Sequence, residues 1–219
     1  MINFFFREKF TILLGVLLTY VIATPFFSSI INEDLWVDIT FSAVMVSAVF
    51  TLSRDKKSRI LGVLLATPCL VLIWLKLSIP SSELILAGVV LQAMFNFYMV
   101  ILIIIFVFHA PVINRDTLSA AIVAYLFVAL FFANAFLCLE LISPGSFSTS
   151  HNQLMADPGV LRYFSFVTLT TLGYGDVVPI SSQAKTLAIG EALIGQIYMT
   201  VLIARLVGVY AAGNHQQGK

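Results

Sequence analysis

The sequence predicts an all-α membrane protein with six transmembrane helices and a re-entrant helix and loop between the last two. Of its 219 residues, 60% are hydrophobic and only 11% are charged, whereas about a quarter of an average soluble domain is charged. Six apolar stretches are near or above the length of a membrane-crossing helix. A seventh, shorter stretch precedes the last of them and leads into a loop with two glycines. These observations exclude a soluble single domain.

The six long stretches cover about residues 10–31, 36–52, 60–79, 84–108, 117–142 and 184–211. Crossing the hydrocarbon core takes about 17 to 25 helical residues, and helices leave no backbone group unpaired in lipid. The second stretch is the shortest, and we expect its Asp38 at a helix end. The first stretch continues well past the roughly 7 to 15 apolar residues of a signal peptide, so we expect it to be retained.

Positive charges orient the predicted helices, because cytoplasmic loops carry an excess of Lys and Arg. Placing both termini and the loops 53–59 and 109–116 in the cytoplasm puts nine of the twelve basic residues there. The other three are Lys76, Arg162 and Lys185. The outer face is then acidic and should concentrate cations. We expect a multi-pass protein of the plasma or inner membrane with both termini in the cytoplasm.

The composition gives little support to metal or nucleic-acid binding. Cys69 and Cys138 lie inside apolar stretches, which favours small buried hydrophobes over a disulfide or metal pair. The histidines His109, His151 and His215 lie far apart, with no zinc-binding spacing. A net charge of +1 argues against a nucleic-acid partner.

Residues 143–183 do not fit a simple span. They hold the turn sequence Ser-Pro-Gly-Ser, a polar segment and an apolar run of only 12 residues at about 160–171. Such a run is too short to cross and predicts a re-entrant helix. Non-helical backbone at membrane depth is tolerated only where protein buries it or water lines it. The loop that follows therefore has the expected geometry of a pore loop.

Residues 171–176, Thr-Leu-Gly-Tyr-Gly-Asp, resemble the selectivity-filter signature of the potassium channel family, with leucine where valine is commoner. The resemblance implies that K⁺ is coordinated by the Thr171 hydroxyl and by the backbone carbonyls of Thr171, Leu172, Gly173 and Tyr174. Potassium is then the permeant ion, and no cofactor is implied. Because the family's filter needs four strands around one axis, the resemblance also implies a homotetramer.

Gly173 and Gly175 have a physical role in such a loop. An ordinary strand alternates its carbonyls, whereas stripping water from an ion needs a row of carbonyls facing one axis. Glycine adopts positive φ freely, so positive φ values that alternate with normal ones could turn every carbonyl inward. Tyr174 could then brace the loop outward. The preceding pore helix would direct the negative end of its dipole toward the cation path.

Three residues are candidates for support of the filter. By resemblance, Tyr163 is a hydrogen-bond partner for Asp176, although an aromatic residue at the membrane interface is an equally open interpretation. Asp176 itself is interpreted as a cation attractor at the outer mouth, as a loop cap, or as both. Glu191 is an acid at membrane depth, where such residues are usually paired or functional. We expect it to hydrogen-bond the pore helix or filter backbone rather than to bind ions directly.

Two residues of the last stretch have further candidate roles. The family often places a flexible glycine where Gly195 stands, so Gly195 is a possible gating hinge. Close helix packing is slightly favoured instead, because Gly190 and Gly208 occupy the same helix. Arg205, about 15 Å further along, is interpreted first as an anchor at the cytoplasmic interface and second as a gate contact.

The chain divides into a four-helix region, residues 1–110, and a two-helix pore module, residues 111–219. Voltage-gated relatives carry arginines along the fourth span, because moving one charge through 100 mV is worth about 2.3 kcal/mol. The fourth stretch here contains no Lys or Arg, so no conventional voltage sensor is expected. Gln92 and Asn96 lie four residues apart on it and are more simply intrahelical or packing groups than partners across a helix interface.

The sequence therefore predicts a potassium-selective channel that conducts passively through a tetrameric pore with little or no voltage gating. Its expected partners are further copies of itself and membrane lipids. An alternative is a ligand- or lipid-responsive membrane sensor or receptor whose four-helix half binds a lipid or small apolar ligand and uses the pore as output. A non-conducting regulatory subunit is also open. An enzyme is not expected, because no pair of carboxylates, activated nucleophile or metal spacing is present.

Overall fold

The structure is a computed structural model that describes residues 8–23, 26, 33–51, 56–79, 81–110, 113–149 and 157–217. Its helices are α2 (Lys9–Leu18), continued by the π-helical turn η1 (Thr19–Ala23), α4 (Glu33–Thr51), α5 (Lys56–Leu75), α6 (Ser82–His109), α7 (Arg115–Ile142), α8 (Pro158–Leu169) and α9 (Ser182–Gln217). Two short strands, β1 (Phe147–Thr149) and β2 (Val177–Pro179), flank α8 in the sequence.

Four helices are long and apolar enough to cross a membrane by length and composition: α5, α6, α7 and the part of α9 at Ser182–Arg205. These match four of the six predicted spans. The other two predictions correspond to shorter apolar helices, Lys9–Ala23 and Leu35–Thr51. The remainder of the first predicted stretch, which was expected to reach residue 31, lies almost entirely outside the described residues. A chain of six complete spans stays a prediction.

Side chains cap the N-termini of three helices. Ser81 caps α6 by accepting from the Leu84 amide at 3.2 Å, and Asn114 caps α7 through the Thr117 amide at 2.8 Å. Asp157 caps α8 by accepting from the Gly159 amide at 2.7 Å, with proline at the first helical position. Each cap satisfies an amide that has no partner within its own helix. Helix α8 therefore begins two residues before the predicted apolar run.

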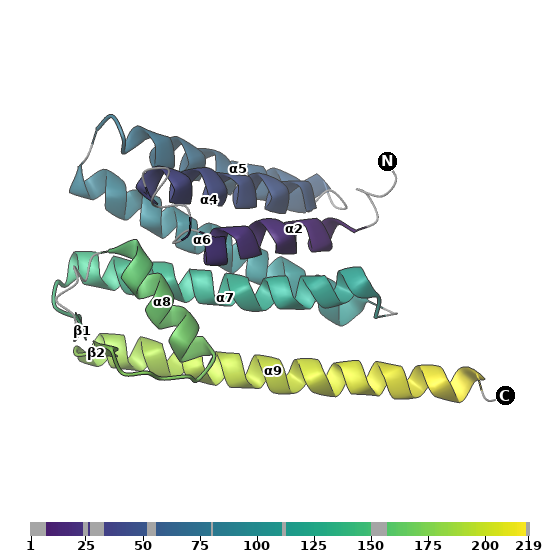
Figure 1. Cartoon of the computed structure of the whole chain (residues 1–219). Coiled ribbons are helices and arrows are strands. Elements are labelled where there is room, and N and C mark those ends of the chain that lie inside the picture. Colours follow the sequence, from purple (N-terminus) through teal and green to yellow (C-terminus); the bar gives the residue numbers. More distant parts are fainter. Residues whose placement is uncertain are drawn as a thin grey trace.

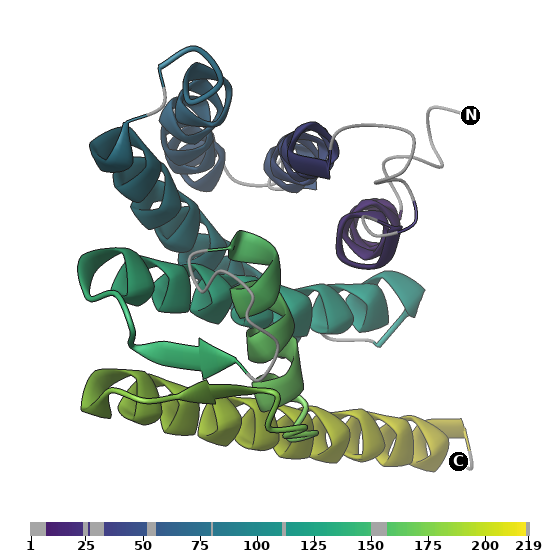
Figure 2. The same cartoon turned by 60° about the vertical axis from the view of Figure 1, so that its left-hand side comes forward.

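Helix α7 is the centre of the packing. It lies between α9 on one side and the N-terminal helices on the other, and α8 runs obliquely between α7 and α9 (Figures 1 and 2). One buried cluster joins α2, α4, α5 and α6 to α7, with Phe95, Met99 and Phe127 among its members. A second cluster joins α7 and α8 to the two strands, where the Phe136 and Phe164 rings lie 5.1 Å apart. Helix α7 thus contributes to both buried clusters.

The two strands close the loop around α8. They pair antiparallel, with Phe147 opposite Pro179 and Thr149 opposite Val177. The Phe147 ring packs on Phe164 of α8 with centroids 5.5 Å apart. This pairing joins the segment before α8 to the segment after the glycine-containing loop. In Figure 1 the strands lie at the end of the molecule where α7 ends and α9 begins.

Candidate functional site

In the loop after α8, residues with positive φ alternate with residues that have ordinary φ values. Thr171, Gly173 and Gly175 have φ values of +57°, +60° and +79°. Leu172 and Tyr174, which lie between them, do not have positive φ, so every second residue lies in the left-handed region. Such alternation can turn successive carbonyls toward one side, which an extended strand cannot do. The two glycines were predicted for this role, whereas Thr171 was not, because positive φ is uncommon for a residue with a Cβ.

Hydrogen bonds to the last turn of α8 hold Thr171 in this conformation. Its amide donates to Thr168 O at 3.0 Å, and the next amide, of Leu172, donates to Val167 O at 2.9 Å. The Gln196 side chain of α9 donates to the Thr171 hydroxyl at 3.3 Å. A left-handed conformation costs a non-glycine residue roughly 1–2 kcal/mol. Three bonds of about 1 kcal/mol each can offset that cost.

Residues 171–175 are all exposed on the single chain. Leu172 is 57% exposed and Tyr174 is 67% exposed. Tyr174 was expected to brace the loop against its surroundings, and in one chain those surroundings are open. A large exposed leucine and tyrosine beside polar backbone form a surface that is suited to contact with further chains.

Tyr163 and Asp176 are brought together, as the sequence interpretation required. The Tyr163 hydroxyl donates to Asp176 Oδ2 at 2.7 Å, and the other carboxylate oxygen accepts from the Val177 amide at 3.0 Å. The bond to the carboxylate raises the pKa of Tyr163 to about 12, so the hydroxyl keeps its proton at neutral pH. Asp176 therefore has contacts that fit a brace to α8 and a cap on the loop.

Glu191 lies behind the loop, fully buried on α9. Its Oε1 forms a hydrogen bond with Ser165 Oγ of α8, and Ser165 Oγ also lies 2.7 Å from the carbonyl of Ala129 on α7. A hydroxyl has one proton and a carbonyl can only accept. If Ser165 donates to Ala129, Glu191 must supply the second proton as a neutral carboxylic acid. Its Oε2 has no partner among the described residues, which also disfavours an ionised carboxylate.

Gly195 packs closely against the end of α8. A Cβ at this position would lie 2.5 Å from Leu169 O and 2.9 Å from Leu169 Cδ1. The same carbonyl accepts from the Tyr125 hydroxyl at 3.1 Å. The last carbonyl of α8 is thus held between α7 and α9. This contact supports the packing interpretation of Gly195, and the hinge interpretation stays a prediction.

Arg205 joins the far part of α9 to the connection between α6 and α7. Its guanidinium donates to Phe108 O at 2.8 Å and to Ala110 O at 2.9 Å, and it lies 5.2 Å from the centre of the Phe108 ring. These contacts hold α9 to the segment after α6, and the interpretations of Arg205 as an anchor at the cytoplasmic interface or as a gate contact stay predictions.

Sequence reasoning missed several residues of this region. Ser165, Tyr125 and Gln196 complete the contacts between α7, α8, α9 and the loop, and hydroxyl and amide side chains inside apolar helices were the available signal. It also missed the ion pair of Lys76 with Asp38, at 2.7 Å. Among the described residues, no group of three His, Cys, Asp or Glu side chains could hold a metal ion.

Known proteins resemble the part of the chain that contains this site. Residues 120–212, from α7 through the loop into α9, match the family described as "Ion channel". Protein LctB of Bacillus caldotenax is 34% identical over 99 residues, which are 43% of this chain and 73% of LctB. Two pore potassium channel c of Oryza sativa subsp. japonica is 38% identical over 64 residues, 29% of this chain and 14% of that channel. Two-pore potassium channel 4 of Arabidopsis thaliana is 39% identical over 61 residues, 28% of this chain and 20% of that channel.

The matched segments of the two plant proteins are thus a small part of their length, whereas most of LctB is covered. The match begins in α7 and leaves out α2, α4, α5 and α6. It contains the alternating loop, the helix before it and most of the helix after it. From this match and from the coverage of LctB, the chain belongs to the ion channel family and is a channel rather than an enzyme.

Proposed function

We propose that the protein is a potassium-selective channel that conducts K⁺ passively, with residues 171–175 as its selectivity filter. The observation that carries the proposal is the alternation of positive φ at Thr171, Gly173 and Gly175. Carbonyls turned to one side can replace the hydration shell of a cation. The names of the two plant relatives, which are potassium channels, support the same ion. K⁺ is the permeant species, and no chemical step or cofactor takes part.

We further propose a homotetramer. One chain supplies one row of filter oxygens, and the filters known for this type of pore enclose the ion with four loops. The exposure of the whole loop in a single chain supports its completion by neighbouring copies. A row of exposed residues on α9, Ile189, Leu193 and Ile197, repeats every four positions and forms one face. That face is available to a neighbouring copy or to lipid.

Little or no voltage gating is part of the proposal. Helix α6 contains no Lys or Arg over its 28 residues, so it carries no gating charge. The field across a membrane does work only on charges that move, at about 2.3 kcal/mol per charge for 100 mV. We also propose that the chain is a multi-pass membrane protein with both termini in the cytoplasm. The start of α2 and the end of α9 lie at the same end of the molecule (Figure 1). This supports a location of both termini on the same side of the membrane.

The test is K⁺ flux into liposomes that contain the purified protein, compared with the variant Gly173→Asp. Aspartate tolerates the left-handed region better than most residues, so the variant should fold while a charged side chain stands beside the ion path. We expect it to lose conduction or selectivity. Gly15→Ala is the matched control, because a Cβ at this helical position meets nothing within 4 Å. A reversal potential near zero for K⁺ against Na⁺, or unchanged flux in Gly173→Asp, would refute the proposal.

A further inference from the structure

A cavity of about 450 Å³ lies between the N-terminal helices and the pore helix. Its walls come from α4, α5, α6, α7 and the start of α8, and it follows α6 from Leu84 to Asn96. Twelve residues of helix make it about 18 Å long. Its volume is within the range of small-molecule sites, roughly 300–1,000 Å³. None of the filter residues takes part in it.

The deep end of the cavity holds a polar side chain with no partner. Asn96 is 0% exposed, and neither its amide nitrogen nor its oxygen has a hydrogen-bond partner among the described residues. A buried amide left in this state is costly, so such groups are normally satisfied. Gln92 and Asn134 also line the cavity. Each carboxamide can both donate and accept, which is the pattern that a hydroxyl group complements.

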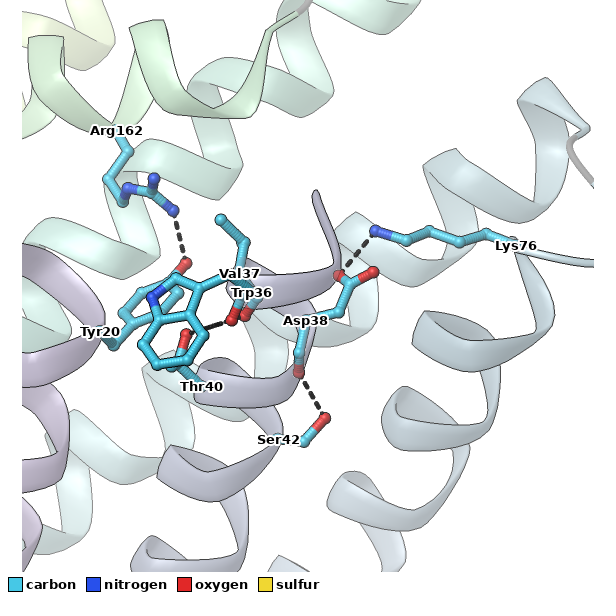
Figure 3. A network of polar contacts seen from close by, with 8 residues as sticks. All are labelled: Tyr20, Trp36, Val37, Asp38, Thr40, Ser42, Lys76 and Arg162. Atoms are coloured by element: carbon cyan, nitrogen blue, oxygen red, sulfur yellow. Dashed lines mark hydrogen bonds and ion pairs between the residues drawn. The ribbon is translucent and has the colours of Figure 1, made fainter. Parts of the chain in front are cut away.

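The other end of the cavity is charged, as Figure 3 shows. Lys76 and Asp38 form an ion pair at 2.7 Å, with the lysine side chain 37% exposed and the aspartate 6%. Asp157, a further carboxylate in the wall, is engaged in capping α8. The Lys76 side chain lies near the surface, so this end is the accessible one.

Arg162 has a different set of partners. Its guanidinium donates to the Tyr20 hydroxyl at 2.8 Å and lies 5.0 Å from the centre of the Tyr20 ring. No carboxylate forms an ion pair with it in the described part of the chain. A guanidinium has five N–H donors in a planar fork that suits a carboxylate or phosphate. Arg162 therefore has donors to offer to an anion in the cavity.

We propose that this cavity binds a small polyhydroxylated anion, with its carboxylate or phosphate on Arg162 and its hydroxyl groups on the carboxamides that lead to Asn96. At roughly 30 Å³ for each water-sized group, 450 Å³ holds about 15 such groups. That is the size of a sugar acid or of the polyol-phosphate headgroup of a lipid. Both sources present the same chemistry. Because Arg162 belongs to α8, an occupant contacts the helix that leads into the filter.

The experiment is calorimetric titration of gluconate into the full-length protein in phosphatidylcholine nanodiscs. Two probes separate the parts of the recognition: sorbitol has hydroxyl groups without the charge, and hexanoate has the charge without the hydroxyl groups. We expect gluconate to bind at one site per chain, about tenfold or more tightly than either probe. Equal affinities for gluconate, sorbitol and hexanoate would overturn the proposal. It would also be overturned if gluconate showed no saturable binding in phosphatidylcholine nanodiscs and phosphatidylglycerol did not raise the unfolding temperature of the protein. This comparison needs no variant.

Three variants test the placement. Arg162→Gln and Asn96→Leu should each weaken gluconate about tenfold, and Arg162→Lys should recover part of the loss because it keeps the charge. Lys185→Gln is the matched control, since Lys185 is exposed at the start of α9 and does not line the cavity. Unchanged affinity in both Arg162→Gln and Asn96→Leu would contradict the assignment.

Nanodiscs that contain phosphatidylglycerol distinguish the two sources. Loss of gluconate binding there, with a higher unfolding temperature, assigns the site to a lipid headgroup, whereas unchanged titration assigns it to a solute. An effect of gluconate on K⁺ flux rests on the proposed channel function. If gluconate binds but does not change K⁺ flux, the binding site stands and only its coupling to the channel is refuted. If K⁺ flux is present but gluconate does not bind, the binding site is refuted and the channel function stands.

Discussion

Replacing Gly195 by alanine should destabilise the contact between α9 and α8. The new Cβ would lie 2.5 Å from the backbone oxygen of Leu169, and a backbone atom at the end of α8 cannot swing aside as a flexible side chain can. Overpacking of this kind costs about 1–3 kcal/mol. Alanine recovers about 0.5–1 kcal/mol of helix propensity. The expected net loss is thus about 0–2.5 kcal/mol, and the displaced carbonyl lies two residues before Thr171, so conduction should fall as well.

The matched control is Gly190→Ala, on the same helix, where a Cβ meets nothing within 4 Å. It should leave stability unchanged or raise it by up to about 1 kcal/mol. The assay is thermal unfolding of the purified variants in one detergent, followed by K⁺ flux in liposomes. If Gly195 served only as a hinge, Gly195→Ala would stiffen the helix and match Gly190→Ala in stability while gating changed. Equal unfolding temperatures for the two variants would therefore refute the packing argument.

The remaining predictions concern the pore helix and the membrane field. Glu191→Gln should fold and conduct nearly as well as the wild type, because its amide can donate to Ser165, whereas Glu191→Ala should lose about 2 kcal/mol or more. Thermal unfolding measures both losses, and equal losses would contradict the role of residue 191 as a donor to Ser165. Tyr163→Phe removes the 2.7 Å bond to Asp176, so the amides after the filter should exchange hydrogen faster, which exchange mass spectrometry measures. The pKa of Tyr163 is raised to about 12, from about 10 in an unfolded chain. The stabilisation that this bond provides is therefore complete below pH 10 and is lost as pH rises through 12. A change in the protection of these amides against exchange between pH 7 and 9 would contradict this. Conductance should vary only weakly with voltage, and a steep curve carrying several gating charges per channel would count against the proposal.

Local features of this protein were predictable because they depend on neighbouring residues. The spacing of Gly173 and Gly175 after a 12-residue apolar run located the loop and its helix, and the structure has a 12-residue helix ending at Leu169. Hydropathy located the four long helices for the same reason, since crossing a bilayer is a matter of length and composition. The positive φ of Thr171 was not predictable from its type, because it depends on bonds to the preceding helical turn and on Gln196 of another helix.

Most pairs between helices were not predicted; the bond of Glu191 to α8 was expected, although not its partner Ser165. Arg162 forms a hydrogen bond with Tyr20, which is 142 residues away in the sequence, and Lys76 forms one with Asp38, which is 38 residues away. In a soluble protein an apolar stripe indicates the face of a helix that packs. In a membrane the lipid-facing side is as apolar as the packed side, so composition carries little information on which faces meet. The expectation that Gln92 and Asn96 serve as intrahelical or packing groups missed the cavity for the same reason.

The sequence by itself determined where the loop with two glycines lies, which segments are long apolar helices and that the fourth of the predicted spans contains no Lys or Arg. These properties follow from residue types and spacings within one segment. The tertiary structure decided that Glu191 lies on Ser165, that Gly195 touches the carbonyl of Leu169, and that a cavity with an arginine at one end and a buried amide at the other borders the pore helix. Each of these depends on the rotation and depth of one helix against another, which side-chain packing sets only when the whole chain is folded.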